Sequence, residues 1–237
     1  MAPPSGIDGN QGDSLEPILR RQSVGTARLE TFSDGVFAIA ITLLILNFHI
    51  PTGLSENQVW DAIADQRDVF LSAAISFAVI GVYWTVNRKT FALIDRTSGA
   101  LTASNFIHLA TIVFLPFPTL VMSEYTESFA AVSMYATTIA LAGFTAVATV
   151  VVAWRGNLMD PTVTQEMMDR TVSSSVGTPI AFAASIPIAA INTRVALWFW
   201  FGAFFVSRPV GVLAQRILRR RRHEKIDSSK APGGSEL

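Results

Sequence analysis

The chain has 237 residues, of which 50% are hydrophobic and only 15% are charged, and its mean hydropathy is +0.41. This composition indicates a small polytopic membrane protein rather than a soluble domain. Cysteine is absent, which excludes disulfides, thiolate catalysis and cysteine metal sites. The formal net charge is zero, yet basic residues crowd near the C-terminus, which indicates a face turned toward an anionic membrane surface and gives no reason to expect nucleic acid.

The two ends of the chain differ in composition from its middle. Residues 1–27 lack the apolar core of a cleavable signal peptide, so we expect a flexible cytoplasmic arm. Residues 218–237 are basic and then rich in turn formers, which predicts a disordered cytoplasmic tail. Between them, residues 28–217 hold six apolar segments long enough to cross about 30 Å of hydrocarbon. The sequence therefore predicts an all-α membrane protein with spans near 30–50, 68–89, 103–122, 129–154, 172–191 and 195–217.

The distribution of Lys and Arg predicts the orientation of these spans. With both termini on one side, sixteen of the 18 Lys and Arg residues fall on that side, and only Arg67 and Arg194 fall on the other. Basic residues are enriched in cytoplasmic loops of membrane proteins. We therefore expect a multi-pass protein of the cell membrane with both termini in the cytoplasm.

The first span begins with a carboxylate, Asp34, directly after Ser33. A charged side chain at the bilayer centre costs about 2.5–3.5 kcal/mol on insertion scales, so such a residue needs an explanation. One interpretation is helix capping, in which a Ser or Asp side chain accepts a hydrogen bond from an orphaned backbone N–H group. The other is a buried polar contact with neighbouring helices of the same chain.

The helical wheel favours the second interpretation. At about 100° per residue, Ile39, Leu43 and Leu46 fall on one narrow stripe, flanked by Gly35 and Thr42. Asp34 points about 140° away from Ile39, toward the other helices of its own subunit. The stripe by itself does not distinguish a lipid-facing surface from a packed one.

The segment that opens this span has the spacing RxxxFSD, formed by Arg28, Phe32, Ser33 and Asp34. Followed by GVFAIAITLLIL, it resembles the signature of the first helix in the transmembrane protein 175 family of potassium channels, of the bacterial single-repeat type. Support comes from Trp84 and Asn87 in the second span and from NFIHLATIVFLPFPT in the third. The seven-position signature is the most specific of these similarities.

The resemblance implies that first helices from several subunits line a central pore. Matched residue by residue, it places Ile39 at the principal constriction, with Leu43 and Leu46 as further apolar rings, and Thr42 at the threonine implicated in ion preference. Because the signature occurs once in the chain, a homotetramer with cyclic symmetry is expected.

The same resemblance implies a polar network that holds the pore helix. Asn87 departs from the family pattern, which commonly has a histidine there, and asparagine cannot become cationic. His108 is then the remaining candidate for proton sensitivity, although an ordinary buried, hydrogen-bonded histidine is the simpler interpretation. The expected network comprises Arg28, Phe32, Ser33, Asp34, Trp84, Asn87 and His108.

These features predict a potassium-selective, leak-like channel that conducts through a hydrophobic constriction. A secondary transporter, or a proton or cation pathway on the same fold, is the alternative. An enzyme is not expected, because GxSxG, HExxH and paired intramembrane carboxylates are all missing from the sequence. We expect no cofactor beyond a permeant potassium ion, no metal site, and as partners only further copies of the chain and membrane lipids, without nucleic acid or a small-molecule substrate.

Overall fold

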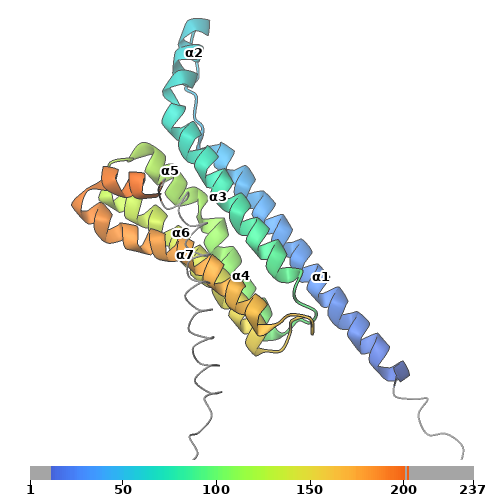
Figure 1. The fold of residues 1–237 in the computed structure, drawn as a ribbon. Helices are drawn as coiled ribbons and strands as arrows, with labels where there is room; N and C mark the ends of the chain where they lie inside the picture. The colour runs from blue at the N-terminus through green and yellow to red at the C-terminus, as the bar shows by residue number, and fades with distance from the viewer. Residues whose placement is uncertain (1–11, 201, 203–237) are drawn as a thin grey trace, which may run out of the picture.

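The chain forms long helices connected by short loops (Figure 1). The computed structural model describes residues 12–200 and 202, with side chains from residue 25 onward. In this part the only bridge between extended residues joins Ile94 and Met159. The helices are α1 (Gly12–Leu43), the 3-10 helix η1 (Leu44–Asn47), α2 (Glu56–Asp65), α3 (Arg67–Phe91), α4 (Gly99–Phe114), α5 (Pro116–Glu124), α6 (Phe129–Arg155) and α7 (Gln165–Ile191).

Five of the six predicted spans are confirmed as helices long and apolar enough to cross a membrane. They cover residues 25–47, 67–91, 99–124, 129–155 and 165–191. The sixth predicted span, 195–217, lies mostly outside the described residues. Its described part is helical, at residues 195–200 and 202. The basic cluster that begins at Arg216 and the tail 218–237 also lie outside them.

Helix α1 begins well before the first predicted span. It starts at Gly12, inside the segment 1–27 where we expected a flexible arm, and crosses Arg28 without a break. Ser33 and Asp34 therefore lie in the middle of a helix, where no orphaned N–H groups need a cap. The capping interpretation of these two residues is wrong.

Proline bends the third span and leaves the fifth continuous. Pro116 is the first residue of α5, where its missing N–H is tolerated, and the chain turns at Leu115 between α4 and α5. In contrast, Pro179 and Pro187 both lie inside α7, which runs unbroken from Gln165 to Ile191. A helix bundle can tolerate such residues because neighbouring groups satisfy the freed carbonyls.

The helices are arranged in layers, visible in Figure 1. α1 and α3 run side by side and form one edge, α4 with α5 and α6 lies behind them, and α7 packs against α6. The ten-residue helix α2 lies before the first residue of α3 and projects beyond the other helices, and none of its residues is buried. The main core lies between α1, α3, α4, α5 and α6, where the largest members include Phe37, Ile80, Leu109, Leu115 and Ile139.

Hydroxyl groups link the helices inside this core. The Ser76 hydroxyl of α3 lies 2.8 Å from that of Thr119 in α5 and 2.9 Å from that of Tyr135 in α6. The Tyr83 hydroxyl donates to the carbonyl of Ile139 at 2.7 Å. These contacts satisfy buried polar groups where no lipid or water could do so.

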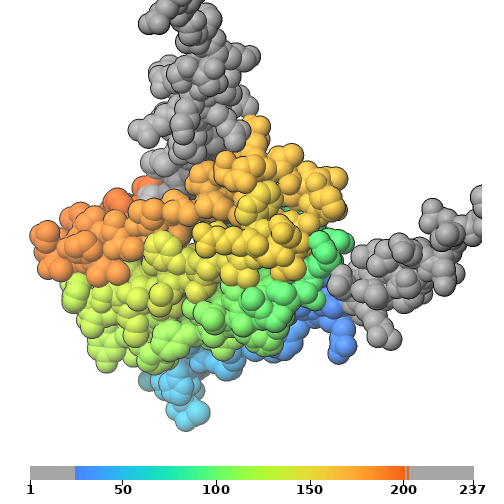
Figure 2. Space-filling view, turned by 90° about the horizontal axis from the view of Figure 1, so that it is seen from below, coloured from blue at the N-terminus to red at the C-terminus, as the bar shows by residue number. Residues whose placement is uncertain are grey.

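At one end of the bundle, the loop after α3 and the loop after α6 are joined through their main chains. The N–H groups of Asp95 and Arg96 donate to the carbonyl of Leu158 at 2.9 and 3.1 Å, and the N–H of Asp160 donates to the carbonyl of Leu93 at 2.9 Å. Figure 2 shows these loops, green near residue 95 and yellow near residue 158, side by side in the view from below. We call this contact the main-chain joint.

Candidate functional site

Helix α1 has a buried face that repeats about once per turn. Leu29, Ser33, Phe37, Ala40 and Leu44 are all at least nine-tenths buried against α3, α4 and α5. This spacing is the i, i+4, i+7 pattern of a helix that packs on one side only.

The opposite face of α1 is largely exposed in the part of the chain that the structure describes. Ile39 and Leu46, predicted to lie on the pore stripe, are 59% and 73% exposed, and Thr42 is exposed as well. Leu43 is half-buried, so it lies at the margin of this exposed face rather than at its centre. The full set of exposed α1 residues from Arg28 onward is Arg28, Thr31, Phe32, Gly35, Ala38, Ile39, Thr42, Ile45 and Leu46, the last two in η1; we call it the open face.

Thr42 contributes the polar group nearest to Ile39 on the open face. Its hydroxyl donates to the carbonyl of Ile39 at 2.8 Å, one turn back along the helix. A hydroxyl oxygen that has donated its single proton still keeps lone pairs for accepting. Thr42 therefore presents an acceptor, and no further donor, to whatever passes the open face.

The buried face of α1 is attached by a chain of hydrogen bonds through α4 to α3. The side-chain amide of Asn105 donates to Oγ of Ser33 at 2.9 Å, and the amide of Asn87 donates to Oδ1 of Asn105 at 3.2 Å. Ser33 in turn donates to the carbonyl of Leu29 at 2.8 Å. All three side chains are buried, so each of these bonds lies away from water.

Asp34 makes a separate contact with α3. The indole Nε1–H of Trp84 donates to its Oδ1 at 2.7 Å. The carboxylate therefore faces the other helices of its own chain, in the direction that the helical wheel predicts. The position of Asp34 thus agrees with a buried polar contact.

The remaining signature residues lie at the edges of these contacts. Phe32 is half exposed, and its ring packs against Phe106 of α4 with centroids 5.2 Å apart. Arg28 is exposed, and among the described residues it takes part in no ion pair. The structure therefore brings Ser33, Asp34, Trp84 and Asn87 into contacts between helices and leaves Arg28 at the surface.

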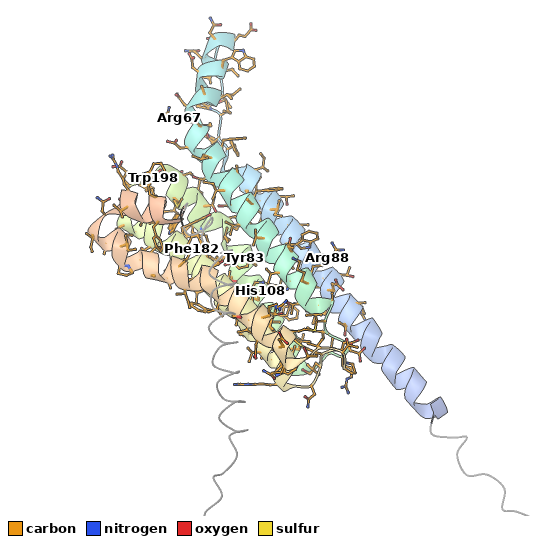
Figure 3. The ribbon with its side chains drawn as sticks, in the orientation of Figure 1. Arg67, Tyr83, Arg88, His108, Phe182 and Trp198 are labelled. Atoms are coloured by element: carbon orange, nitrogen blue, oxygen red, sulfur yellow. The ribbon has the colours of Figure 1, made fainter. Side chains whose placement is uncertain are left out.

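His108 lies apart from the asparagine chain. It is buried beside the rings of Phe37 and Tyr83, with centroids 6.0 and 6.1 Å away, and both His108 and Tyr83 point into the interior in Figure 3. Its Nδ1 lies 3.1 Å from the Thr145 hydroxyl, which itself donates to the carbonyl of Leu141 at 2.8 Å. Whether Nδ1 donates or accepts in this contact depends on which ring nitrogen of His108 carries the proton.

Asn105 is the contact residue that sequence reasoning missed. It bridges α1 and α3 but was not among the predicted network residues. A signal was present, since Asn105 lies three residues before His108 and both therefore share one face of α4. Among the described residues, no group of three His, Asp or Glu side chains could hold a metal ion.

Comparison with known proteins places these observations in a family. The sequence model of the family described as "Endosomal/lysosomal potassium channel TMEM175" matches residues 28–116. This segment of the chain is therefore similar to that family. The family-matched segment contains α3, α4 and the part of α1 that carries the RxxxFSD signature, so it includes every contact between helices described above for Ser33, Asp34, Trp84 and Asn87.

Individual relatives carry channel names. "Potassium channel B446_29190" of Streptomyces collinus is 38% identical over 100 residues, which are 42% of this chain and 48% of that protein. "Endosomal/lysosomal proton channel TMEM175" of Gallus gallus is 32% identical over 108 residues, which are 42% of this chain and 22% of that protein. The chain thus matches about half the length of the bacterial relative. These names are those of ion channels.

The fold is shared over a longer stretch. The crystal structure of a lysosomal potassium-selective channel TMEM175 homologue from Chamaesiphon minutus matches 81% of this chain and 98% of that chain, with a TM-score of 0.65 at 24% identity. At this identity the likeness shows the fold alone. The helical arrangement of TMEM175 channel structures therefore extends beyond the family-matched segment.

Proposed function

We propose that this TMEM175 relative is a potassium-selective, leak-like channel of the cell membrane. Four copies are arranged around an axis, each with six spans, and their α1 helices line the pore. Ile39 forms the principal constriction, with Leu43 and Leu46 as further apolar rings. Both termini lie in the cytoplasm, as the Lys and Arg distribution predicts, and lipids surround the assembly.

One observation carries this proposal: α1 is held on one side by hydrogen bonds and is open on the other. A helix that packs only against its own chain would not need Ser33 and Asp34 fixed so specifically to α3 and α4. Fixing one face determines the direction of the opposite face, which holds Ile39, Thr42 and Leu46. Such a helix is suited to present defined side chains to a symmetry axis.

A single chain cannot enclose a pore with one such helix. The open face is flanked by α3 on one side and α4 on the other, both of which contact α1. Further copies must therefore supply the remaining walls, and closed cyclic symmetry is the usual way to arrange them. The homotetramer rests on this need and on the single copy of the signature in the sequence.

Conduction through apolar rings has a simple physical account. A narrow ring of Ile side chains is unfavourable for water and for a hydrated ion, so it closes by dewetting and conducts when it widens. At the widened ring, the Thr42 hydroxyl replaces part of the ion's lost hydration by its free lone pairs. Sodium holds water more tightly than potassium and is penalised more, which gives a moderate preference for potassium.

The first test is ion flux into liposomes that contain the purified protein. Ile39→Asn places a polar amide at the constriction, so we expect faster potassium flux and a smaller preference for potassium over sodium. Ile180→Asn is the matched control, because Ile180 of α7 is similarly exposed, at 53%, but lies far along the chain from the open face. Unchanged flux in Ile39→Asn would show that Ile39 is not the constriction.

A proton pathway is the second candidate, because the relative from Gallus gallus is named a proton channel. The same liposomes with an internal pH indicator separate the two candidates. If the protein conducts potassium alone, charge builds up and stops the potassium flux until a protonophore is added. If the protein conducts protons, the lumen acidifies along the pH gradient. Saturable flux that depends on a second ion gradient would instead favour a secondary transporter.

A further inference from the structure

Asp34 is a carboxylate in a membrane span without a direct cationic partner. The ion pairs among the described residues join Arg67 with Asp68, Arg170 with Glu166 and Arg194 with Glu127. None of them includes Asp34. A charge in this position is costly unless another charge or a strong hydrogen bond compensates it.

The indole of Trp84 supplies the hydrogen bond. Its Nε1–H donates to Oδ1 of Asp34 at 2.7 Å, a length typical of a donor facing an ionised acceptor. The indole has a single donor, and Asp34 uses it. The ring faces of Trp84 remain available for a second interaction.

Arg88 occupies one of these faces. Its guanidinium carbon lies 5.7 Å from the centroid of the Trp84 ring, within the range of a cation–π contact. The two residues are four apart on α3, so they share one face of that helix. In Figure 3, Arg88 lies near the end of α3, where α3 runs alongside α1.

We infer that Arg88 is the counter-charge of Asp34 and acts through the Trp84 indole. A cation over the ring draws electron density from the indole and makes its N–H a stronger donor toward the carboxylate. The three side chains form a stack that joins α3 to α1, in which each charge is stabilised by the same ring. Arg88 is thus a positioning residue that fixes the direction of the open face; its effect on conduction rests on the function proposed above.

Lys89 provides the matched control. It is the next residue, carries the same charge, is also exposed, and lies about 100° around α3 from Arg88. Both residues belong to the inner basic group that orients the protein in the membrane. A role in topology alone would therefore give Arg88 and Lys89 the same effect when either charge is removed.

The direct test uses the resonances of fluorinated tryptophan in the purified protein. The chain has five tryptophans, and Trp84→Phe assigns the resonance of interest. Arg88→Met and Asp34→Asn should each shift the Trp84 resonance and leave the other four in place. Arg88→Lys should keep it near the wild-type position, and Lys89→Met should not move it. A Trp84 resonance that does not move in Arg88→Met, or moves equally in Lys89→Met, would overturn the inference.

A second measurement examines the coupling between the two charges. A cation–π contact of about 0.5–1 kcal/mol corresponds to about a 2- to 5-fold change in the ratio of folded to unfolded protein. Arg88→Met should lower this ratio by that factor in the wild type, and by much less when Asp34→Asn is already present. If Arg88→Met lowers the ratio equally in the wild type and in Asp34→Asn, the proposed coupling between the two charges is contradicted. If Arg88→Met does not fold, Arg88→Gln gives the same comparison, with Arg88→Lys as the variant that keeps the charge.

Flux measurements separate this inference from the proposed function. If the protein conducts, Arg88→Met should reduce flux while keeping the preference between potassium and sodium, and Lys89→Met should leave both unchanged. A change of ion preference in Arg88→Met would show that Arg88 does not act through the position of α1. If the wild type carries no flux, the channel proposal fails, whereas the tryptophan resonances still decide the role of Arg88.

Discussion

The two sides of this molecule hold their helices together by different means. α1 is attached to α3 and α4 through hydrogen bonds of Ser33, Asp34 and Asn105, and its other face is open. α6 and α7 instead associate through shape, with a Pro179 ring fitted directly against Gly143. Apolar helices gain no hydrophobic free energy by meeting in lipid, so close packing and hydrogen bonds are the two available means. The side with specific hydrogen bonds is the one that carries the open face.

The largest expected effect is on the hydrogen-bonded side. Asn105→Ala removes the link between Ser33 and Asn87, leaves the Asn87 amide unpaired and opens a small cavity, so we expect a loss of about 2–4 kcal/mol in the free energy of unfolding in detergent. Ser104→Ala is the control on the same helix, since it loses only a partly buried contact with Thr149. Equal losses in the two variants would mean that the asparagine chain is not special.

The close-packed side should respond to added volume. A Cβ at position 143 would lie 2.7–3.0 Å from the ring atoms of Pro179, which cannot rotate away. Gly143→Ala should therefore cost about 1–3 kcal/mol by overpacking. In Gly177→Ala the new methyl group meets nothing within 4 Å, so that variant should be neutral or slightly stabilising. Unfolding in detergent measures both, and a neutral Gly143→Ala would refute packing by shape.

A smaller effect on stability is expected from the ion pair between Glu127, just before α6, and Arg194, just after α7. Arg194 donates from Nε to a carboxylate oxygen of Glu127 at 3.0 Å, but both side chains are largely exposed. Exposed ion pairs contribute about 0–1 kcal/mol. A double-mutant cycle of Glu127→Gln and Arg194→Gln should give a coupling in this range that falls with added salt. A coupling well above it would show that this pair, rather than packing, holds the outer ends of α6 and α7.

The smallest expected effect is confined to acid pH and to the loop before α7. The hydroxyl and the backbone N–H of Thr162 donate to Asp160 at 2.5 and 2.8 Å, and they lower the pKa of this exposed carboxyl below its ordinary value of 3.8. A lowered pKa stabilises the folded protein above the ordinary value, and the benefit is lost as the pH falls through the folded pKa. The difference in melting temperature between wild type and Asp160→Asn should therefore be constant above about pH 5 and shrink as the pH falls below 3.8 and through the lowered folded pKa. A constant difference down to pH 3 would exclude this contribution.

Much of the fold followed from apolar length alone, because lipid requires about twenty apolar residues per helix. Apolar length predicted five of the spans, and the helical wheel predicted the inward direction of Asp34. The start of α1 at Gly12 was not, since its first turns are too polar to give a membrane signal. The bend at Leu115 was missed because a Pro that begins a new helix and one inside a helix look alike in sequence, as Pro116 and Pro179 show.

The candidate site was predicted less completely. Periodicity placed Ile39, Leu43 and Leu46 on one stripe, and in the structure Ile39 and Leu46 are exposed whereas Leu43 is half-buried at the margin. Asn105 was missed because its role depends on which residues of α1 and α3 lie opposite it, and helix spacing does not reveal that. Trp84 and Asp34 both belonged to the expected network, but the hydrogen bond that joins them is known only from the tertiary structure.

The main-chain joint between the loops after α3 and α6 has a consequence for sequence divergence. Its bonds use the N–H and carbonyl groups of residues 93–96 and 158–160, which every residue except proline supplies. Substitutions in these loops can thus accumulate without uncoupling the two ends of the bundle. The family match covers residues 28–116, whereas the helical arrangement is shared over 81% of the chain. Because the joint uses main-chain atoms, it connects the two loops whichever side chains they carry.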